Sequence, residues 1–126
     1  MNTVTATDYQ AIAQRYIAAW NATGAARADA IAQAFAPGAH YADPRMQAQG
    51  HAALDQMIGA AQQQFGGLRF HLDGLADGHG ERLRFRWTLG PDAATAIAKG
   101  TDFAVLAADG RLAQVSGFLD LVPQAG

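Results

Sequence analysis

The period of the hydrophobic pattern changes near residue 67, and this change limits the possible folds more than any other feature of the chain. Before it, apolar residues recur every three or four positions, as on the buried face of a helix. After it, apolar and charged residues alternate: in "RLRFRW" the apolar Leu83, Phe85 and Trp87 alternate with arginines. Such alternation is typical of half-buried antiparallel strands. The sequence therefore predicts helices first and a β-sheet second, which is an α+β chain.

The first predicted helix has the clearest pattern. In "TATDYQ", Thr7 is the expected N-cap and Gln10 its partner in a capping box. The helix is expected to end between Asn21 and Gly24. Its apolar residues fall on a single stripe: Tyr9, Ile12, Ala13, Tyr16, Ile17 and Trp20.

Two further helices and one strand complete the first half of the chain. A second helix is predicted from about Arg27 to Phe35, and "PG" at 37–38 is expected to stop it. The strand "AHYAD" follows. A third helix is predicted from about His51 to the glycine pair at 66–67.

Four strands are predicted in the second half. They are "LRFHL", "RLRFRW", "TDFAVLA" and "LAQVSGFLDLV", separated by the turn signals "DGHG", "GPD" and "DG". Three amphipathic helices can cover one face of such a sheet. We expect a strongly curved, mixed or antiparallel sheet, cone-shaped around an apolar hollow that binds small molecules.

Composition narrows the function classes. With 126 residues the chain is expected to be one domain, 1–126. A net charge of −2 does not favour nucleic acid, and the absence of cysteine excludes disulfides and thiolate chemistry in this sequence. There is no signal-peptide pattern and no apolar run of 18 residues, so we expect a cytoplasmic protein without membrane contact. The histidines lack metal-ligand spacing, so neither metal nor cofactor is expected, and His51 is interpreted as a solvated first-turn residue.

Asp43 ends the strand "AHYAD" just before Pro44, and two interpretations are open. Asp before proline is a common start of a turn. Strand alternation, however, puts Asp43 on the same face as Tyr41, so a buried Tyr41 would bring the carboxylate into the hollow. Arg45 would lower the pKa of Asp43. That arrangement suits a carboxylate that activates water, or an arginine that clamps a substrate.

Tyr16 and Asp102 are the other two candidate catalytic residues. Tyr16 is either a core tyrosine or a hydrogen-bond donor to a substrate carbonyl. Asp102 lies in "TDFAVL", which is apolar on both faces, so alternation cannot assign its face. A buried carboxylate without a partner stays protonated. The alternative is an ion pair with Lys99 or with an arginine among residues 82–86.

The candidate substrate-binding residues come from both halves of the chain. Gly117 has no side chain and would widen the hollow or allow the sheet to bend. Together these residues indicate an apolar, medium-sized ligand: Trp20, Tyr41, Met57, Phe85, Trp87, Val115, Gly117 and Leu119.

Three segments carry a resemblance to a known superfamily: "RYIAAW", "AHYADP…GHAAL" and "GTDFAVLAADGRLAQVSGFLD". From about Tyr9 to Val122 the chain resembles the nuclear transport factor 2-like superfamily, and within it the SnoaL-like polyketide cyclase and ketosteroid isomerase branch. The resemblance implies that Asp43 is a general base that removes a proton α to a carbonyl. It also implies that Tyr16 and a protonated Asp102 donate hydrogen bonds to the enolate oxygen.

The chain departs from those isomerases where they carry two further tyrosines, because the matching positions are Phe35 and Ile58. We therefore expect a cofactor-independent isomerase or cyclase for an apolar cyclic substrate rather than a steroid isomerase. A water-activating hydratase or hydrolase, or a non-catalytic ligand-binding or dimerisation module, remain alternatives. The resemblance also implies a homodimer through the outer face of the sheet, at Arg82, Arg84 and Arg86.

Overall fold

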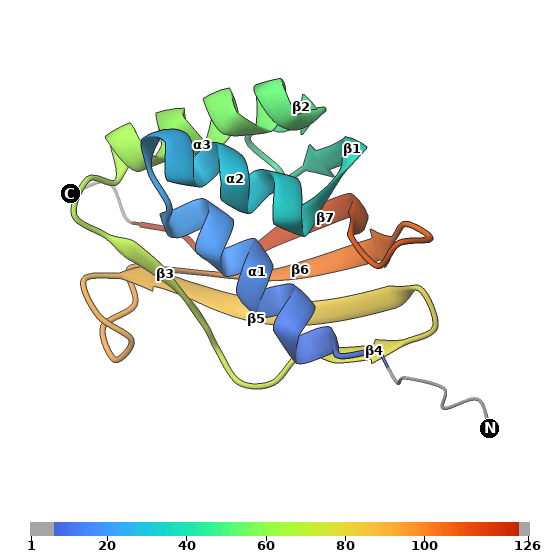
Figure 1. Cartoon of the computed structure of the whole chain (residues 1–126). Coiled ribbons are helices and arrows are strands. Elements are labelled where there is room, and N and C mark those ends of the chain that lie inside the picture. Colours follow the sequence, from blue (N-terminus) through green and yellow to red (C-terminus); the bar gives the residue numbers. More distant parts are fainter. Residues whose placement is uncertain (1–6, 124–126) are drawn as a thin grey trace.

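The structure is a computed structural model that describes residues 7–123 (Figure 1). Within this range the elements are, in chain order, α1 (Tyr9–Asn21), α2 (Gly24–Ala34), β1 (Phe35–Ala42), β2 (Gln47–Gln49), α3 (His51–Gln64), β3 (Arg69–Leu72), β4 (Asp77–His79), β5 (Arg82–Gly90), β6 (Ala98–Leu106) and β7 (Leu112–Leu121).

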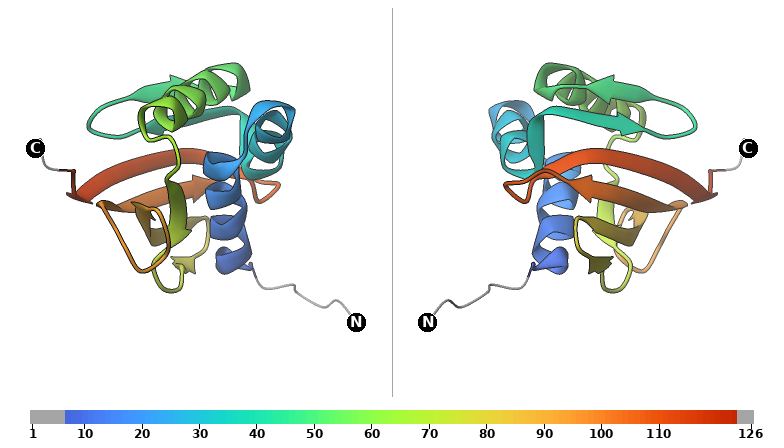
Figure 2. Two further views of the ribbon diagram at one scale, coloured as in Figure 1. Left: turned by 90° about the vertical axis from the view of Figure 1, so that its left-hand side faces the viewer. Right: turned by 90° about the vertical axis from the view of Figure 1, so that its right-hand side faces the viewer.

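The strands form one mixed sheet in the order β2-β1-β7-β6-β5-β3, with β4 also paired to β5. Most neighbours are antiparallel, but β1 and β7 run parallel, so the first strand of the chain lies beside the last. Helix α1 crosses one face of the sheet, and α2 and α3 pack over its β1–β2 end (Figure 1). The predicted α+β class and mixed sheet are confirmed. Figure 2 shows β7 as an arc, while the strong curvature of the whole sheet stays a prediction.

The register of the strands decides which side chains share the inner face. Phe85, Asp102 and Gly117 lie opposite one another on β5, β6 and β7, and all three are buried. Arg84 and Phe103 lie opposite each other on the outer face, and both are exposed. Asp102 therefore belongs to the inner face, which alternation alone could not assign.

The cap of α1 differs from the sequence-based prediction. Asp8, not Thr7, is the N-cap, and its carboxylate accepts a hydrogen bond from the backbone N–H of Ala11 at 3.0 Å. The capping-box interpretation of Gln10 is wrong. Its side-chain oxygen accepts from the backbone N–H of Ala76 at 2.7 Å, which ties α1 to the loop before β4.

Pro37 and Gly38 do not separate a helix from a strand. Helix α2 ends at Ala34, and β1 begins at Phe35 and runs through both residues. The register of β1 against β7 is irregular between Phe35 and His40. The missing N–H of Pro37 therefore falls where the ladder is already interrupted, and the strand tolerates it.

Two short strands were not predicted, because three residues carry too little alternation to be recognised. Strand β2 is one of them. Strand β4 is the other: the segment "DGHG" predicts only a turn, but its first three residues pair with Arg82–Arg84. The turn itself lies at Gly80, whose φ of 55° favours glycine.

His51 is not the solvated residue that the sequence suggested. Its Nε2 lies 2.9 Å from the carbonyl oxygen of Phe35 and 3.1 Å from that of Ala36. The ring is partly buried and ties the start of α3 to the start of β1. This contact helps to hold the loop that carries Asp43 between two anchored elements.

Residues 7–123 contain neither a membrane-spanning helix nor a cluster of metal-ligating side chains. No helix in this range has the length and hydropathy needed to cross a membrane. Nor do three His, Asp or Glu side chains gather there in a way that could hold a metal ion. A cytoplasmic location stays a prediction.

Candidate active site

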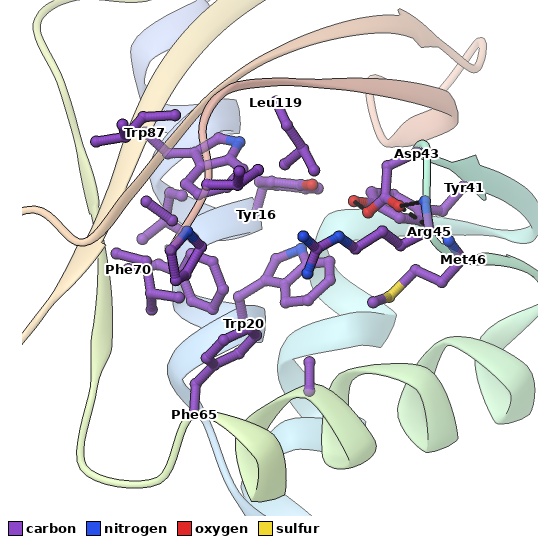
Figure 3. Close-up of a pocket in the computed structure, with 17 residues that line it drawn as sticks. Tyr16, Trp20, Tyr41, Asp43, Arg45, Met46, Phe65, Phe70, Trp87 and Leu119 are labelled. Carbon is purple, nitrogen blue, oxygen red and sulfur yellow. Dashed lines mark hydrogen bonds between the residues drawn. The ribbon is translucent and has the colours of Figure 1, made fainter. Parts of the chain in front are cut away.

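A pocket lies between α1, the β1–β2 loop, the end of α3 and the inner face of the sheet (Figure 3). The space that it encloses is about 70 Å³, less than the roughly 150 Å³ cavity that accepts benzene in an engineered protein core. Its wall is mostly apolar and aromatic. Six of the residues that we predicted for the site lie on this wall: Tyr16, Trp20, Tyr41, Asp43, Trp87 and Leu119.

Tyr16 and Trp87 both donate hydrogen bonds to Asp102. The Tyr16 hydroxyl lies 2.5 Å from Oδ2, and the Trp87 indole nitrogen lies 3.0 Å from Oδ1. Asp102 is 1% exposed and is not part of the pocket wall. It lies behind the two aromatic residues, so a ligand would meet Tyr16 and Trp87 first. The alternative interpretation, an ion pair of Asp102 with Lys99 or a nearby arginine, is wrong, since no such pair occurs within residues 7–123.

Burial raises the pKa of the Asp102 carboxyl from 3.8 to about 6. The hydrogen bonds from Tyr16 and Trp87 lower this pKa, and the nearby charge of Asp43 raises it again. Burial, and then the charge of Asp102, raises the pKa of Tyr16 well above 10, so the hydroxyl keeps its proton. Asp102 is therefore the acidic group whose protonation changes in the mildly acidic range.

Asp43 is held by three donors. The Tyr41 hydroxyl lies 2.5 Å from Oδ2, and the backbone N–H groups of Arg45 and Met46 lie 2.8 and 2.9 Å from Oδ1. The two backbone bonds form an Asx turn, so the turn interpretation is correct for Oδ1. The carboxylate also lines the pocket. The turn and site interpretations are thus both compatible with the geometry, because the turn fixes the carboxylate at the pocket wall.

Gly117 lies between the two carboxyl groups. A Cβ at this position would lie 3.1 Å from Asp102 Oδ1, 3.1 Å from Asp43 Cβ and 3.3 Å from the Tyr41 hydroxyl. Three polar side chains, from β1, the loop after it and β6, therefore converge on the space that this glycine leaves empty. Any larger residue at 117 would push them apart.

Four predicted substrate-binding residues lie outside the pocket wall: Gly117, described above, and Phe85, Val115 and Met57. Phe85 is covered by the Tyr16 ring, with the ring centroids 5.0 Å apart. Val115 is fully buried beside Tyr41, because the parallel β1–β7 pairing covers it. Met57 packs against the core from the middle of α3. Only the end of that helix reaches the pocket.

Several wall residues were missed in the sequence. Phe70 packs between Trp20 and Trp87, with ring centroids 5.2 and 5.4 Å apart. Its alternation with Leu68 and Leu72 was a usable signal, since it placed Phe70 on the inner face. Met46 and Phe65 also line the pocket, but no pattern pointed to them: Met46 follows the Asx turn and Phe65 follows the last turn of α3.

A second hollow of about 340 Å³ adjoins the first and shares Trp20, Phe65 and Phe70 with it. Among the described residues that line it, none is Asp or Glu. Acid–base chemistry on a ligand therefore has its candidate groups in the first pocket and not in the second.

A family model for the SnoaL-like domain matches residues 13–115 of this chain. A solved structure of a proposed isomerase of the SnoaL-like family, from Agrobacterium tumefaciens str. C58, is 45% identical, with a TM-score of 0.83. That comparison covers 89% of this chain and 97% of the other. A search of curated proteins found no match.

Two more distant structures have the same fold. One is a proposed polyketide cyclase from Sinorhizobium meliloti, 21% identical with a TM-score of 0.67, covering 85% of this chain and 93% of the other. The second is a proposed SnoaL-like polyketide cyclase from Jannaschia sp. CCS1, 15% identical with a TM-score of 0.72, covering 95% and 92%. At these identities the likeness shows the fold alone. The family match and the Agrobacterium structure show more than the fold: this chain belongs to the SnoaL-like family of the nuclear transport factor 2-like superfamily.

Proposed function

We propose that the pocket catalyses proton transfer next to a carbonyl group of a small apolar cyclic substrate, without a cofactor, as an isomerase or a cyclase does. The observation that carries this proposal is the convergence around Gly117. There, Tyr41 and Asp43 of the pocket wall come close to Asp102, which lies behind the wall and accepts a hydrogen bond from Tyr16. The Agrobacterium relative, itself a proposed isomerase, supports the same reaction class.

Asp43 is the proposed base. It takes the proton from the carbon next to the carbonyl, the electron pair of that C–H bond forms a C=C bond, and negative charge moves to the carbonyl oxygen. The Tyr16 hydroxyl donates a hydrogen bond to that oxygen. Where the enolate is conjugated with a second C=C bond, return of the proton to the far carbon gives an isomer. Attack of the enolate carbon on a second carbonyl of the same molecule gives a ring, and the alkoxide formed from that carbonyl takes the proton back from Asp43.

Asp102 is proposed to polarise Tyr16. When its carboxyl is protonated, it donates to the Tyr16 oxygen, and the Tyr16 hydroxyl is free to donate to the substrate. Phe35 and Ile58 have no hydroxyl, so they cannot polarise Tyr16 as the additional tyrosines of the isomerases do. In this chain the proposed group that polarises Tyr16 is the buried Asp102 carboxyl, which lies behind the pocket wall.

Solvent deuterium exchange into cyclic ketones tests the proposal. The native chain should speed up exchange at the carbon next to the carbonyl, and Asp43→Asn should remove most of the acceleration. Asp73→Asn is a matched control, since Asp73 is exposed beyond β3 and does not line the pocket. Equal exchange by the native chain and Asp43→Asn would exclude Asp43 as the base. The pocket would then belong to a ligand-binding module.

The outer face of the sheet is the proposed homodimer interface. Phe103 and Phe118 are 41% and 58% exposed there, an unusual amount of apolar surface for two neighbouring strands. The same face carries Arg84 and Asp120, so two copies related by a twofold axis could pair opposite charges around the two rings. Analytical ultracentrifugation should show a dimer for the native chain and a monomer for Phe118→Glu. A native monomer would contradict the proposal.

A further inference from the structure

Arg45 is an exposed arginine on the pocket wall, and its charge has no partner within residues 7–123. Arg27 and Arg111 pair with Asp55 and Asp109, at 2.7 and 2.8 Å. Within residues 7–123, no carboxylate lies within 4.0 Å of the Arg45 guanidinium. The nearest carboxylate in sequence, Asp43, is held by other donors and does not pair with it.

The Arg45 side chain points into the pocket. Its backbone N–H is fixed by the Asx turn at Asp43, and its side chain forms part of the pocket wall. Figure 3 shows it extending from the β1–β2 loop toward the pocket interior rather than away from it. A guanidinium in this place presents five N–H donors and a full positive charge to whatever enters.

Trp20 lines the same pocket, and its buried indole N–H is a second donor without a partner within residues 7–123. Trp20 is 6% exposed, and within residues 7–123 its Nε1 is buried without a hydrogen-bond partner. Leaving a buried donor unpaired costs about 1–3 kcal/mol, so such groups usually have a function or a missing partner. The ring itself is fixed by Tyr41 and Phe70, at centroid distances of 5.5 and 5.2 Å.

We infer that Arg45 and the Trp20 indole N–H bind a carboxylate on the substrate, so that the substrates of this pocket are small cyclic carbonyl compounds that carry an acid group. Both groups can only donate, and the group that they bind must therefore accept. The planar guanidinium fork matches a carboxylate in shape and charge. This inference rests on the proposed function for the carbonyl and names the other end of the same substrate.

A carboxylate fits better than a phosphate. One guanidinium balances one negative charge, whereas a doubly charged phosphate would leave an excess charge beside Asp43 in a mostly apolar pocket. The position of Arg45 points the same way. Because only about 70 Å³ is enclosed, a ring enters the pocket only in part, and the rest of the substrate lies at the mouth beside the exposed Arg45.

Binding of two matched probes tests the inference. The probes are 4-oxocyclohexanecarboxylate and its neutral carboxamide, measured by isothermal titration calorimetry. The native chain should bind the acid at least about tenfold more tightly, the usual size of a charge-assisted hydrogen bond. Arg45→Gln should remove this preference and leave the affinity for the amide unchanged. Trp20→Phe keeps the ring and should also weaken binding of the acid.

Arg15→Gln is the control for a general loss of positive charge, because Arg15 is exposed on α1 outside the pocket. It should keep the full preference for the acid. The inference would be overturned if the native chain bound the two probes equally or did not bind the acid. It would also be overturned if Arg45→Gln lost the same affinity for both probes.

The same variants separate this inference from the proposed function. Asp43→Asn should keep the preference for the acid while it loses deuterium exchange. A chain that prefers the acid but exchanges no deuterium would overturn the proposed reaction and leave the acid site in place. A chain that exchanges deuterium but binds the acid and the amide equally would overturn the acid site and leave the proposed reaction in place.

Discussion

The Tyr16 hydroxyl donates to the buried Asp102 carboxylate over 2.5 Å, although 86 positions separate the two residues in the sequence. This bond joins the first helix to the centre of the sheet. It also links the protonation of a group behind the pocket wall to the hydrogen bond that a residue on the wall can offer. Two of the predictions below follow directly from that link.

The rate of deuterium exchange should fall as the pH rises above about 6. The proposed mechanism needs Asp102 protonated, and its pKa in the free protein is about 6. Above that pH, kcat/KM should drop about tenfold per pH unit, as expected for the loss of one essential proton. Asp102→Asn should have no such decline. A rate that rises through pH 6 would contradict the proposed need for a protonated Asp102.

Asp102 should make the fold less stable as the pH rises. Its pKa is raised from 3.8 to about 6 on folding, so the folded state holds the proton more tightly. Stability is therefore highest below about pH 4 with respect to this group and falls between pH 4 and 6, by about 3 kcal/mol in total. Chemical denaturation at pH 4, 5, 6 and 8 measures this fall.

Asp102→Asn should remove that fall and be more stable than the native chain at pH 8. Asn keeps the size of the side chain, and its oxygen can still accept from Trp87. Asp29→Asn is the control, because Asp29 is exposed on α2 and should leave the pH dependence unchanged. If the stability of Asp102→Asn fell with pH as that of the native chain does, the raised pKa of Asp102 would not be the cause of the fall.

Tyr16→Phe should slow deuterium exchange by about 10²–10³-fold, the usual cost of one donor to a developing oxyanion. Substrate binding should change little, because the ring and its contacts with Phe35 and Phe85 remain. Tyr9→Phe is the matched control. It removes a hydroxyl from the same helix, but one that donates to the backbone carbonyl of Gly80 at 2.7 Å and does not line the pocket.

Gly117→Ala should abolish exchange at a modest cost in stability. The added methyl group would lie 3.1 Å from both Asp102 Oδ1 and Asp43 Cβ, so at least one carboxyl has to move. Overpacking of this kind costs about 1–3 kcal/mol. Gly38→Ala, where a Cβ meets nothing within 4 Å, should leave activity and stability near native values. Full activity of Gly117→Ala would show that catalysis does not depend on the close approach of Asp43 and Asp102 around Gly117.

Much of the site could be predicted from the sequence, because alternation along a strand shows which side chains share a face of the sheet. Alternation in one short strand placed Asp43 beside Tyr41, and the two are hydrogen-bonded. Where a strand is apolar on both faces, alternation carries no such information, and the face of Asp102 needed the register with Gly117. Resemblance supplied Asp102 as a candidate, but not its position behind the wall.

The wrong predictions concern side chains that lie on the expected face of the sheet or helix but are too deeply buried, or too far along the helix, to line the pocket. Val115 and Phe85 are on the inner face as predicted, yet other side chains cover them. Met57 is on the core side of α3, while the pocket begins one turn later at Ala61. The orphan N–H of Trp20 has no sequence signal at all, since hydrogen-bond pairing is a property of the folded chain.

The parallel pairing of β1 with β7 has a consequence for how the site is made. Tyr41 and Val115 are neighbours across that pair, so β1, which leads into the loop with Asp43, gains its inner partner only when the last strand of the chain is present. On a ribosome, the helices and β1 are synthesised long before β7 emerges. Contacts between such distant segments form late and slowly. A chain shortened before β7 should therefore have no pocket, and the complete site is the final product of folding.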